Sequence, residues 1–120
     1  MKAAMLVFLI GVPMVAAAQT ENFDSTAKGA FPSGWKAGVT GQGSNHWTVN
    51  PDSSAPSAPN VLTQDAKGTF PWVVKEGVSI TDGFVEVKFK SISGKEDQAG
   101  GVMWRWKDGN FYILCLSEKS

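Results

Sequence analysis

The sequence predicts an all-β domain of antiparallel strands, and three observations carry this prediction. Beyond residue 18 the apolar residues never keep a 3.6-residue period over three turns, as an amphipathic helix requires. Short alternating runs are separated instead by turn residues, among them many of the 13 glycines and 6 prolines. Near the C-terminus, residues 96–112 join a polar loop, a glycine pair, a tryptophan-rich strand and an Asp-Gly turn into one hairpin-like unit. This pattern favours a β-sandwich.

The first 18 residues are predicted to be a secretory signal peptide that takes no part in the fold. Lys2 provides a short basic region, residues 5–15 are apolar, and three alanines ending at Ala18 precede Gln19. This order is that of a leader cleaved between Ala18 and Gln19. The apolar run is shorter than the roughly 20 residues of a membrane span. We therefore expect export to the bacterial periplasm or medium without membrane attachment after cleavage; an uncleaved anchor is the alternative.

The length and net charge of the chain limit the functions that we expect of it. Residues 19–120 suffice for one small domain, and the full chain has 11 basic and 11 acidic residues. Loss of Lys2 with the leader leaves ten basic against eleven acidic residues, a net charge of about −1. Nucleic-acid binding needs a clustered basic face. A near-neutral chain without a run of Lys and Arg therefore argues against a nucleic-acid partner.

The cysteine and histidine content argues against disulfides and metals. Cys115 is the single cysteine and His46 the single histidine, and they lie far apart in the chain. A disulfide within the chain is therefore excluded, and Cys115, inside an apolar run, is expected to be buried. The pair does not form a ligand cluster of the usual spacing, so neither a metal nor a cofactor is expected.

In the first half of the chain, residues 19–58 are expected to be mostly loop. A first strand is expected to begin at Phe23, and a Pro-Ser-Gly turn places Trp35 at a sheet edge. The glycine-rich residues 38–44 are expected to be flexible. Residues 47–49 form a strand that an Asn-Pro-Asp turn ends, because these residues are typical of turns.

The second half of the chain is expected to be richer in strands. Residues 53–59, with two prolines, are predicted to be an exposed loop, and residues 67–69 a turn. The expected strands are 60–64, 72–75, 78–81, 83–91, 102–107 and 111–116. An Asp-Gly turn at 108–109 connects the last two.

Two of these strands show an alternating pattern that predicts one buried and one solvated face. In residues 83–91, the buried face would carry Val85, Val87 and Phe89, and the wet face Glu86, Lys88 and Lys90. In residues 102–107, one face would carry Val102, Trp104 and Trp106, and the opposite face Met103, Arg105 and Lys107.

The candidate ligand-binding residues come from the tryptophans and from the wet faces. Five tryptophans are many for a small domain, and exposed aromatic rings stack on the apolar faces of sugars. Trp104 and Trp106 are nevertheless expected in the core, where aromatic side chains dominate. Trp72, at a strand start, is open to either role. Arg105, Glu86 and Lys88 together would form a polar floor for a carbohydrate or carboxylate, or else an ion-paired solvated face.

No catalytic residue is expected. A glycosidase needs two carboxyl groups about 5 to 10 Å apart. Glu96 and Asp97 are adjacent and would point to opposite faces of a strand, so they are expected to be solvated loop residues. His46 is expected to be a surface histidine, since the sequence identifies no Ser, Cys or Asp partner for it.

Several short segments resemble the N-terminal part of the concanavalin-like jelly-roll domains of exported bacterial proteins. These belong to the domain of unknown function 1080 group, also labelled 3-keto-disaccharide hydrolase or family 16 glycoside hydrolase-like. The segments are 31–35, 59–62, 68–72, 82–89 and 96–112. The resemblance implies an antiparallel jelly-roll β-sandwich, of which residues 19–120 would form a part. Residues 113–120 do not match, and the group continues for several more strands, so a truncated or frameshifted product is expected.

The resemblance does not imply glucanase activity, because the Glu-x-Asp-x-x-Glu strand of family 16 glucanases is absent from the sequence. The favoured function is therefore an exported, non-catalytic carbohydrate-binding or structural module. The alternatives are a fragment of a keto-disaccharide hydrolase-like enzyme and a truncated product without independent function. The expected partners are a carbohydrate and, through uncovered strands, a second copy of the chain.

Overall fold

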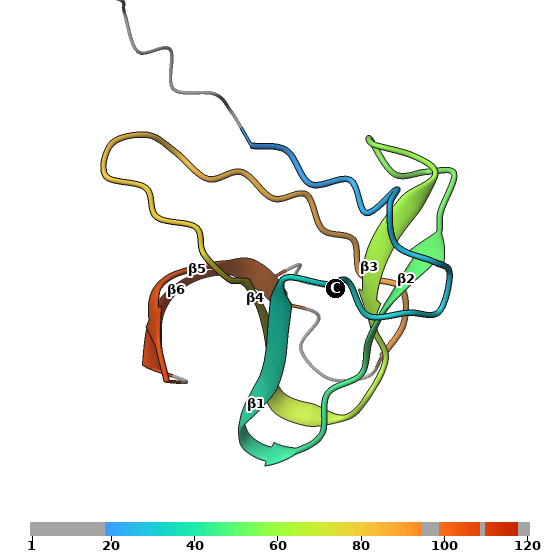
Figure 1. Ribbon diagram of the computed structural model, residues 1–120. Helices are drawn as coiled ribbons and strands as arrows, with labels where there is room; N and C mark the ends of the chain where they lie inside the picture. The colour runs from blue at the N-terminus through green and yellow to red at the C-terminus, as the bar shows by residue number, and fades with distance from the viewer. Residues whose placement is uncertain (1–18, 95–98, 109, 118–120) are drawn as a thin grey trace, which may run out of the picture.

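A computed structural model describes residues 19–94, 99–108 and 110–117 (Figure 1). The predicted signal peptide, with Ala18, and the loop residues Glu96 and Asp97 lie outside the described residues, and Gln19 is exposed. The strands are β1 (Trp35–Gly43), β2 (Trp47–Pro51), β3 (Asn60–Gln64), β4 (Gly68–Lys75), β5 (Ala99–Lys107) and β6 (Asn110–Ser117). They pair antiparallel as β1–β4, β2–β3 and β5–β6.

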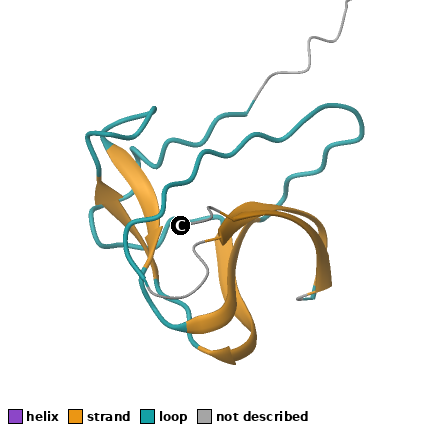
Figure 2. Ribbon diagram, turned by 180° about the vertical axis from the view of Figure 1, so that it is seen from behind, coloured by secondary structure: helices purple, strands orange, loops and turns teal. Residues whose placement is uncertain are grey.

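The prediction of an all-β antiparallel fold is confirmed at this level. The described residues contain no helix, and hence none long and apolar enough to cross a membrane. Each of the three sheets is two-stranded, and they are small and open (Figure 2). The strands expected at 47–49, 60–64, 72–75, 102–107 and 111–116 lie within β2, β3, β4, β5 and β6.

Strand β1 replaces the flexible loop that was expected at residues 38–44, and its glycines explain why. Gly38 lies opposite Trp72 in β4, and a Cβ at Gly38 would overlap the indole ring of Trp72. Gly41 and Gly43 have φ of 93° and 94°, which glycine adopts at little cost. The glycines thus let β1 pass under a large aromatic ring and bend at its end. The turn expected at 67–69 is also wrong, because β4 already begins at Gly68.

The β2–β3 hairpin carries the fully buried Val49, whose exposed fraction is 0%. The N-terminal loop closes over this residue: the amide of Gly29 donates to the Val49 carbonyl at 2.7 Å, and the amide of Val49 donates to the Ala30 carbonyl at 2.9 Å. Phe23, expected to begin a strand, lies in this loop with a φ of 62°. The segment 53–59 forms the mostly exposed loop that was expected.

The prediction of strands at residues 78–81 and 83–91 is wrong. These residues form a long excursion between β4 and β5 (Figure 1). Val85, Val87 and Phe89, expected to be buried, are 58%, 50% and 43% exposed. Their alternation is suited to a strand, but a strand also needs a neighbour, and the described residues form no backbone ladder with this segment. We call residues 83–91 the unpaired segment.

The C-terminal strands β5 and β6 pair as the antiparallel hairpin that was expected. Asp108 lies in the turn, while Gly109 is outside the described residues. Cys115 pairs through its backbone with Gly101 of β5. The burial expected for the Cys115 side chain falls outside the described part of the structure.

Candidate ligand-binding face

The geometry of β5–β6 depends on a β-bulge at Arg105. Trp104 pairs with Tyr112, but the next pair is Lys107 with Asn110, so two residues of β5 lie opposite one residue of β6. Arg105 has a φ of 53°, in the left-handed region that L-residues other than Asn and Asp rarely adopt. The extra residue resets the alternation of β5, because side chains point to opposite faces in turn.

The bulge places Trp104 and Trp106 on opposite faces of the hairpin. Tyr112 and Asn110 are two residues apart in β6 and share a face, so their partners Trp104 and Lys107 share it too. Trp106, which neighbours Lys107, therefore lies on the other face. The prediction that Trp104 and Trp106 share one buried face is wrong, because simple alternation does not hold across a bulge.

One face of the hairpin presents an aromatic pair to solvent. The rings of Trp104 and Tyr112 are nearly parallel, with centroids 6.2 Å apart and planes at 19°. Trp104 is 47% exposed and Tyr112 61%. The guanidinium carbon of Arg105 lies over the Tyr112 ring, 5.9 Å from its centroid. We call Trp104, Arg105 and Tyr112 the aromatic platform.

A shallow pocket adjoins the aromatic platform. It has a volume of about 270 Å³ and is lined by Val85, Val102, Trp104 and Leu114. Val102 and Leu114 are cross-strand partners on the same face as Trp104. Val85 comes from the unpaired segment, which thus borders the pocket. This volume is just below the usual range of small-ligand pockets, about 300 to 1,000 Å³, so the pocket suits a single ring.

Polar residues border the aromatic platform on the side away from the pocket. Lys107 and Asn110 pair across the hairpin on the face of Trp104, and both are exposed. With Arg105 they supply donors, and Asn110 also supplies an amide acceptor. The face therefore combines flat aromatic surface with hydrogen-bonding groups.

The opposite face of the hairpin packs toward β1–β4. The rings of Trp106 and Trp72 are 5.5 Å apart at 54°, and the ammonium of Lys36 lies 5.0 Å from the Trp106 ring centroid. Both indoles are half-buried, and their Nε1 atoms are buried without a hydrogen-bond partner among the described residues. Trp72, which the sequence left open, is therefore placed between two sheets.

The other ligand candidates lie on the unpaired segment. Glu86 and Lys88 form an ion pair of 3.8 Å, with side chains 66% and 65% exposed. Because this segment is not a strand beside β5, the polar floor expected from Glu86, Lys88 and Arg105 on one sheet is wrong. The two charges form an ion-paired solvated surface, which was the alternative interpretation.

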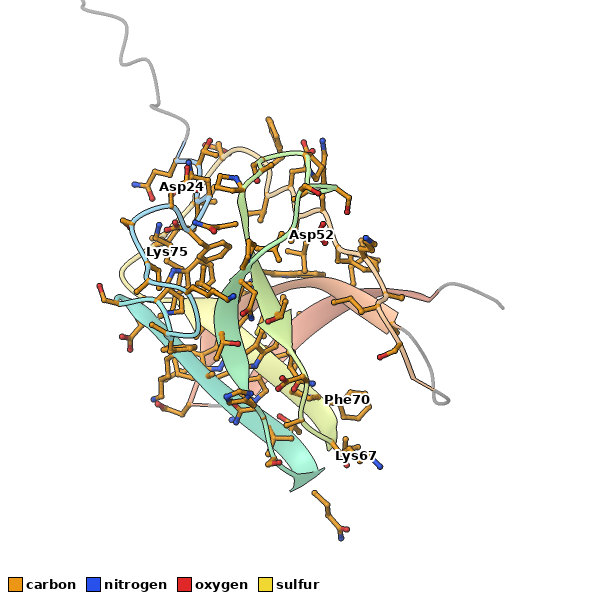
Figure 3. The ribbon with its side chains drawn as sticks, turned by 90° about the vertical axis from the view of Figure 1, so that its right-hand side faces the viewer. Asp24, Asp52, Lys67, Phe70 and Lys75 are labelled. Atoms are coloured by element: carbon orange, nitrogen blue, oxygen red, sulfur yellow. The ribbon has the colours of Figure 1, made fainter. Side chains whose placement is uncertain are left out.

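A second ion-pair cluster fixes the N-terminal loop on β1–β4. The Glu21 carboxylate accepts a hydrogen bond from the amide of Phe23 at 2.9 Å and pairs with the Lys75 ammonium at 3.0 Å. The Phe23 hydrogen bond first, and Lys75 second, hold the pKa of Glu21 below its ordinary value. The Phe23 ring packs on Trp35 at 5.5 Å. Figure 3 shows Lys75 and Asp24 at the opposite end of β4 from Lys67 and Phe70.

The arrangement around the single histidine does not form a metal centre. His46 Nδ1 pairs with the Asp65 carboxylate where β2 begins and β3 ends, a partner that sequence reasoning missed. Both side chains are more than half exposed. Within the described residues, His, Cys, Asp and Glu do not cluster in threes as a metal site requires.

Comparisons with known proteins leave the family open. No protein-family model matches the chain, and neither curated proteins nor solved structures include a significant match.

Proposed function

We propose that the protein is an exported, non-catalytic carbohydrate-binding module whose contact surface is the aromatic platform. The observation that carries this proposal is the solvent-exposed stack of Trp104 and Tyr112, with the Arg105 guanidinium beside it. Exposed aromatic surface that is bordered by polar residues is typical of a binding site. The jelly-roll sandwich, of which β1–β6 would form a part, belongs to the same proposal.

Sugar chemistry fits this surface better than a purely apolar ligand. The C–H face of a pyranose ring packs on an indole or phenol ring, whose π-face is partially negative. The pocket beside Trp104 is apolar, while Arg105, Lys107 and Asn110 stand at the other end of the face. Hydroxyl groups of a sugar would accept hydrogen bonds from these donors as its ring covers Trp104.

The positive charges beside the aromatic platform also determine which sugars it would prefer. Arg105 and Lys107 carry positive charge, and Asn110 is neutral. A carboxylate forms stronger hydrogen bonds with a guanidinium than a neutral hydroxyl does. The platform therefore favours acidic glycans over neutral ones of the same size.

The test is binding of the purified protein to defined oligosaccharides, with polygalacturonate fragments as acidic probes and cellohexaose as the neutral probe. Trp104→Ala and Tyr112→Ala should each weaken binding by about two- to tenfold, because one ring–ring contact contributes roughly 0.5–1.5 kcal/mol beyond its burial. Phe70→Ala, which truncates a 59% exposed aromatic in β4, is the matched control and should bind as the parent does. A folded protein that binds neither probe, or equal loss in all three variants, would refute the proposal.

A further inference from the structure

We propose that the unpaired segment is a self-pairing strand: residues 83–91 of two copies form an antiparallel two-stranded ribbon about a two-fold axis at Val87. This inference concerns the unpaired segment, which adjoins the aromatic platform only through Val85 in the pocket beside Trp104, and it does not depend on carbohydrate binding. It rests on the exposure of the segment, on the side chains that hold it and on its charge pattern.

The segment is available for pairing. Phe84 is 85% exposed, and every residue from 83 to 90 is exposed. Among the described residues, the backbone of this segment exchanges no hydrogen bond with another part of the chain. An extended run of β-type residues with free amides and carbonyls is a template for a further strand.

The segment is also held in place. Lys90 donates to Ser54 Oγ at 2.9 Å and lies 3.7 Å from the Asp52 carboxylate, which ties one end to the β2–β3 loop. A Cβ at Gly100 would lie 2.7 Å from the Phe89 ring, so this ring rests on the backbone of β5. Val85 lines the pocket beside Trp104. These contacts keep the segment ordered, which lowers the entropy lost on pairing.

The charge pattern is complementary to itself in one register. In an antiparallel pair with its axis at Val87, Glu86 lies opposite Lys88 of the second copy, and Lys88 lies opposite Glu86. Only this axis sets these two residues against each other. Parallel in-register pairing would place Glu86 against Glu86, and like charges directly opposite are destabilising.

The apolar side is complementary in the same register. Val85 lies opposite Phe89 of the second copy, and Val87 lies opposite its own equivalent. Aromatic and β-branched residues are favoured cross-strand partners. The two-fold axis makes the contact isologous, so it closes at a dimer. A single ribbon is a small interface, and we expect a weak dimer that depends on concentration.

The decisive test uses charge exchange and sedimentation velocity across micromolar to millimolar protein. The parent should dimerise, and Glu86→Lys or Lys88→Glu alone should weaken dimerisation by about tenfold or more, since each opposite-charge pair contributes roughly 0.2–1 kcal/mol and two become repulsive. An equimolar mixture of these two variants should dimerise again, and so should the double variant Glu86→Lys/Lys88→Glu. Glu76→Lys and Lys67→Glu are matched controls, exposed and outside the segment, and should behave as the parent.

A second measurement fixes the register. In a Cys115→Ser background, Val87→Cys should form a disulfide-linked dimer under mild oxidation, because directly opposed strand residues have Cα atoms about 4.5–5.5 Å apart. Phe84→Cys, which would lie opposite Lys90, should not. A parent that stays monomeric at all concentrations, or a dimer that the charge variants leave unchanged and that the Phe84→Cys chain crosslinks equally well, would overturn the proposal.

Discussion

Trp104 and Trp106 stand two residues apart on β5 and lie on opposite faces of the β5–β6 hairpin. The bulge at Arg105 causes this separation, because Trp104 pairs with Tyr112 and Lys107 with Asn110. The Trp104 indole is thereby exposed to solvent and stacks on the Tyr112 ring, whereas the Trp106 indole packs on Trp72 in β4. A single irregular residue thus divides the tryptophan-rich strand between a surface and an interior role.

The backbone at Arg105 predicts an unusual order of stability among its variants. A left-handed conformation costs an L-residue about 1–2 kcal/mol and costs glycine very little. Arg105→Gly should therefore be more stable than Arg105→Ala by about 1 kcal/mol, although both lose the contact with Tyr112. Urea unfolding of the two variants measures this difference. Equal stabilities would show that residue 105 does not need the positive φ of 53°.

The close approach of Gly38 to Trp72 predicts that even one methyl group is not tolerated in β1. Gly38→Ala places a Cβ inside the space of the Trp72 ring, which also contacts the Trp106 ring. Overpacking of this kind costs about 1–3 kcal/mol. Thermal unfolding should show the loss. Gly34→Ala, in the turn just before β1, provides the contrast to this steric overlap. Nothing lies within 4 Å of a Cβ at Gly34, so only its φ of 77° opposes the substitution.

These two residues also illustrate which parts of the structure the sequence could predict. Turn residues and alternation located β2, β3, β5 and β6, because those strands obey local rules. Gly38 was assigned to a flexible loop, because its reason for being glycine is a ring that lies 34 positions away at Trp72. Likewise, alternation alone could not reveal that residues 83–91 lack a neighbouring strand.

The candidate site was predictable only in part for the same reason. Arg105 is a ligand candidate in the sequence because it falls on the solvated face of its strand, opposite the tryptophans, whereas the same alternation assigns Trp104 to the core. Tyr112 was missed, although it is the only tyrosine of the chain and lies near the start of a strand that follows an Asp-Gly turn. The pairing of Tyr112 with Trp104 follows from the bulge, and a bulge without glycine leaves little signal in one sequence.

The Glu21–Lys75 pair predicts an acid-sensitive N-terminal loop. The Phe23 amide and Lys75 hold the pKa of Glu21 below its ordinary value. A lowered pKa in the folded state means that the stabilisation is present above the unfolded-state pKa of Glu21 and is lost as pH falls through the folded-state pKa. Packing of the loop on Trp35 should therefore be constant near neutral pH and weaken in acid.

NMR titration of the Glu21 side chain, together with the Trp35 indole signal, measures this effect. Glu21→Gln should weaken the loop at neutral pH and remove its dependence on acid. Glu76→Gln, which changes an exposed carboxylate just after β4, should leave the profile unchanged. A Trp35 signal that does not follow the titration of Glu21 would contradict the role assigned to this ion pair.

The contact between Trp72 and Trp106 predicts energetic coupling between two sheets that share no hydrogen-bonded strand. Their rings meet at 5.5 Å and 54°, a tilted geometry favoured by the aromatic quadrupole. A double-mutant cycle with Trp72→Leu and Trp106→Leu should give a coupling free energy of about 0.5–1.5 kcal/mol. The equivalent cycle for Trp72 and Trp104 should give a value near zero, because the bulge turns Trp104 to the other face of the hairpin. If Trp104 coupled to Trp72 as strongly as Trp106 does, the two tryptophans of β5 would share a face after all, and the exposed aromatic platform would not exist in solution.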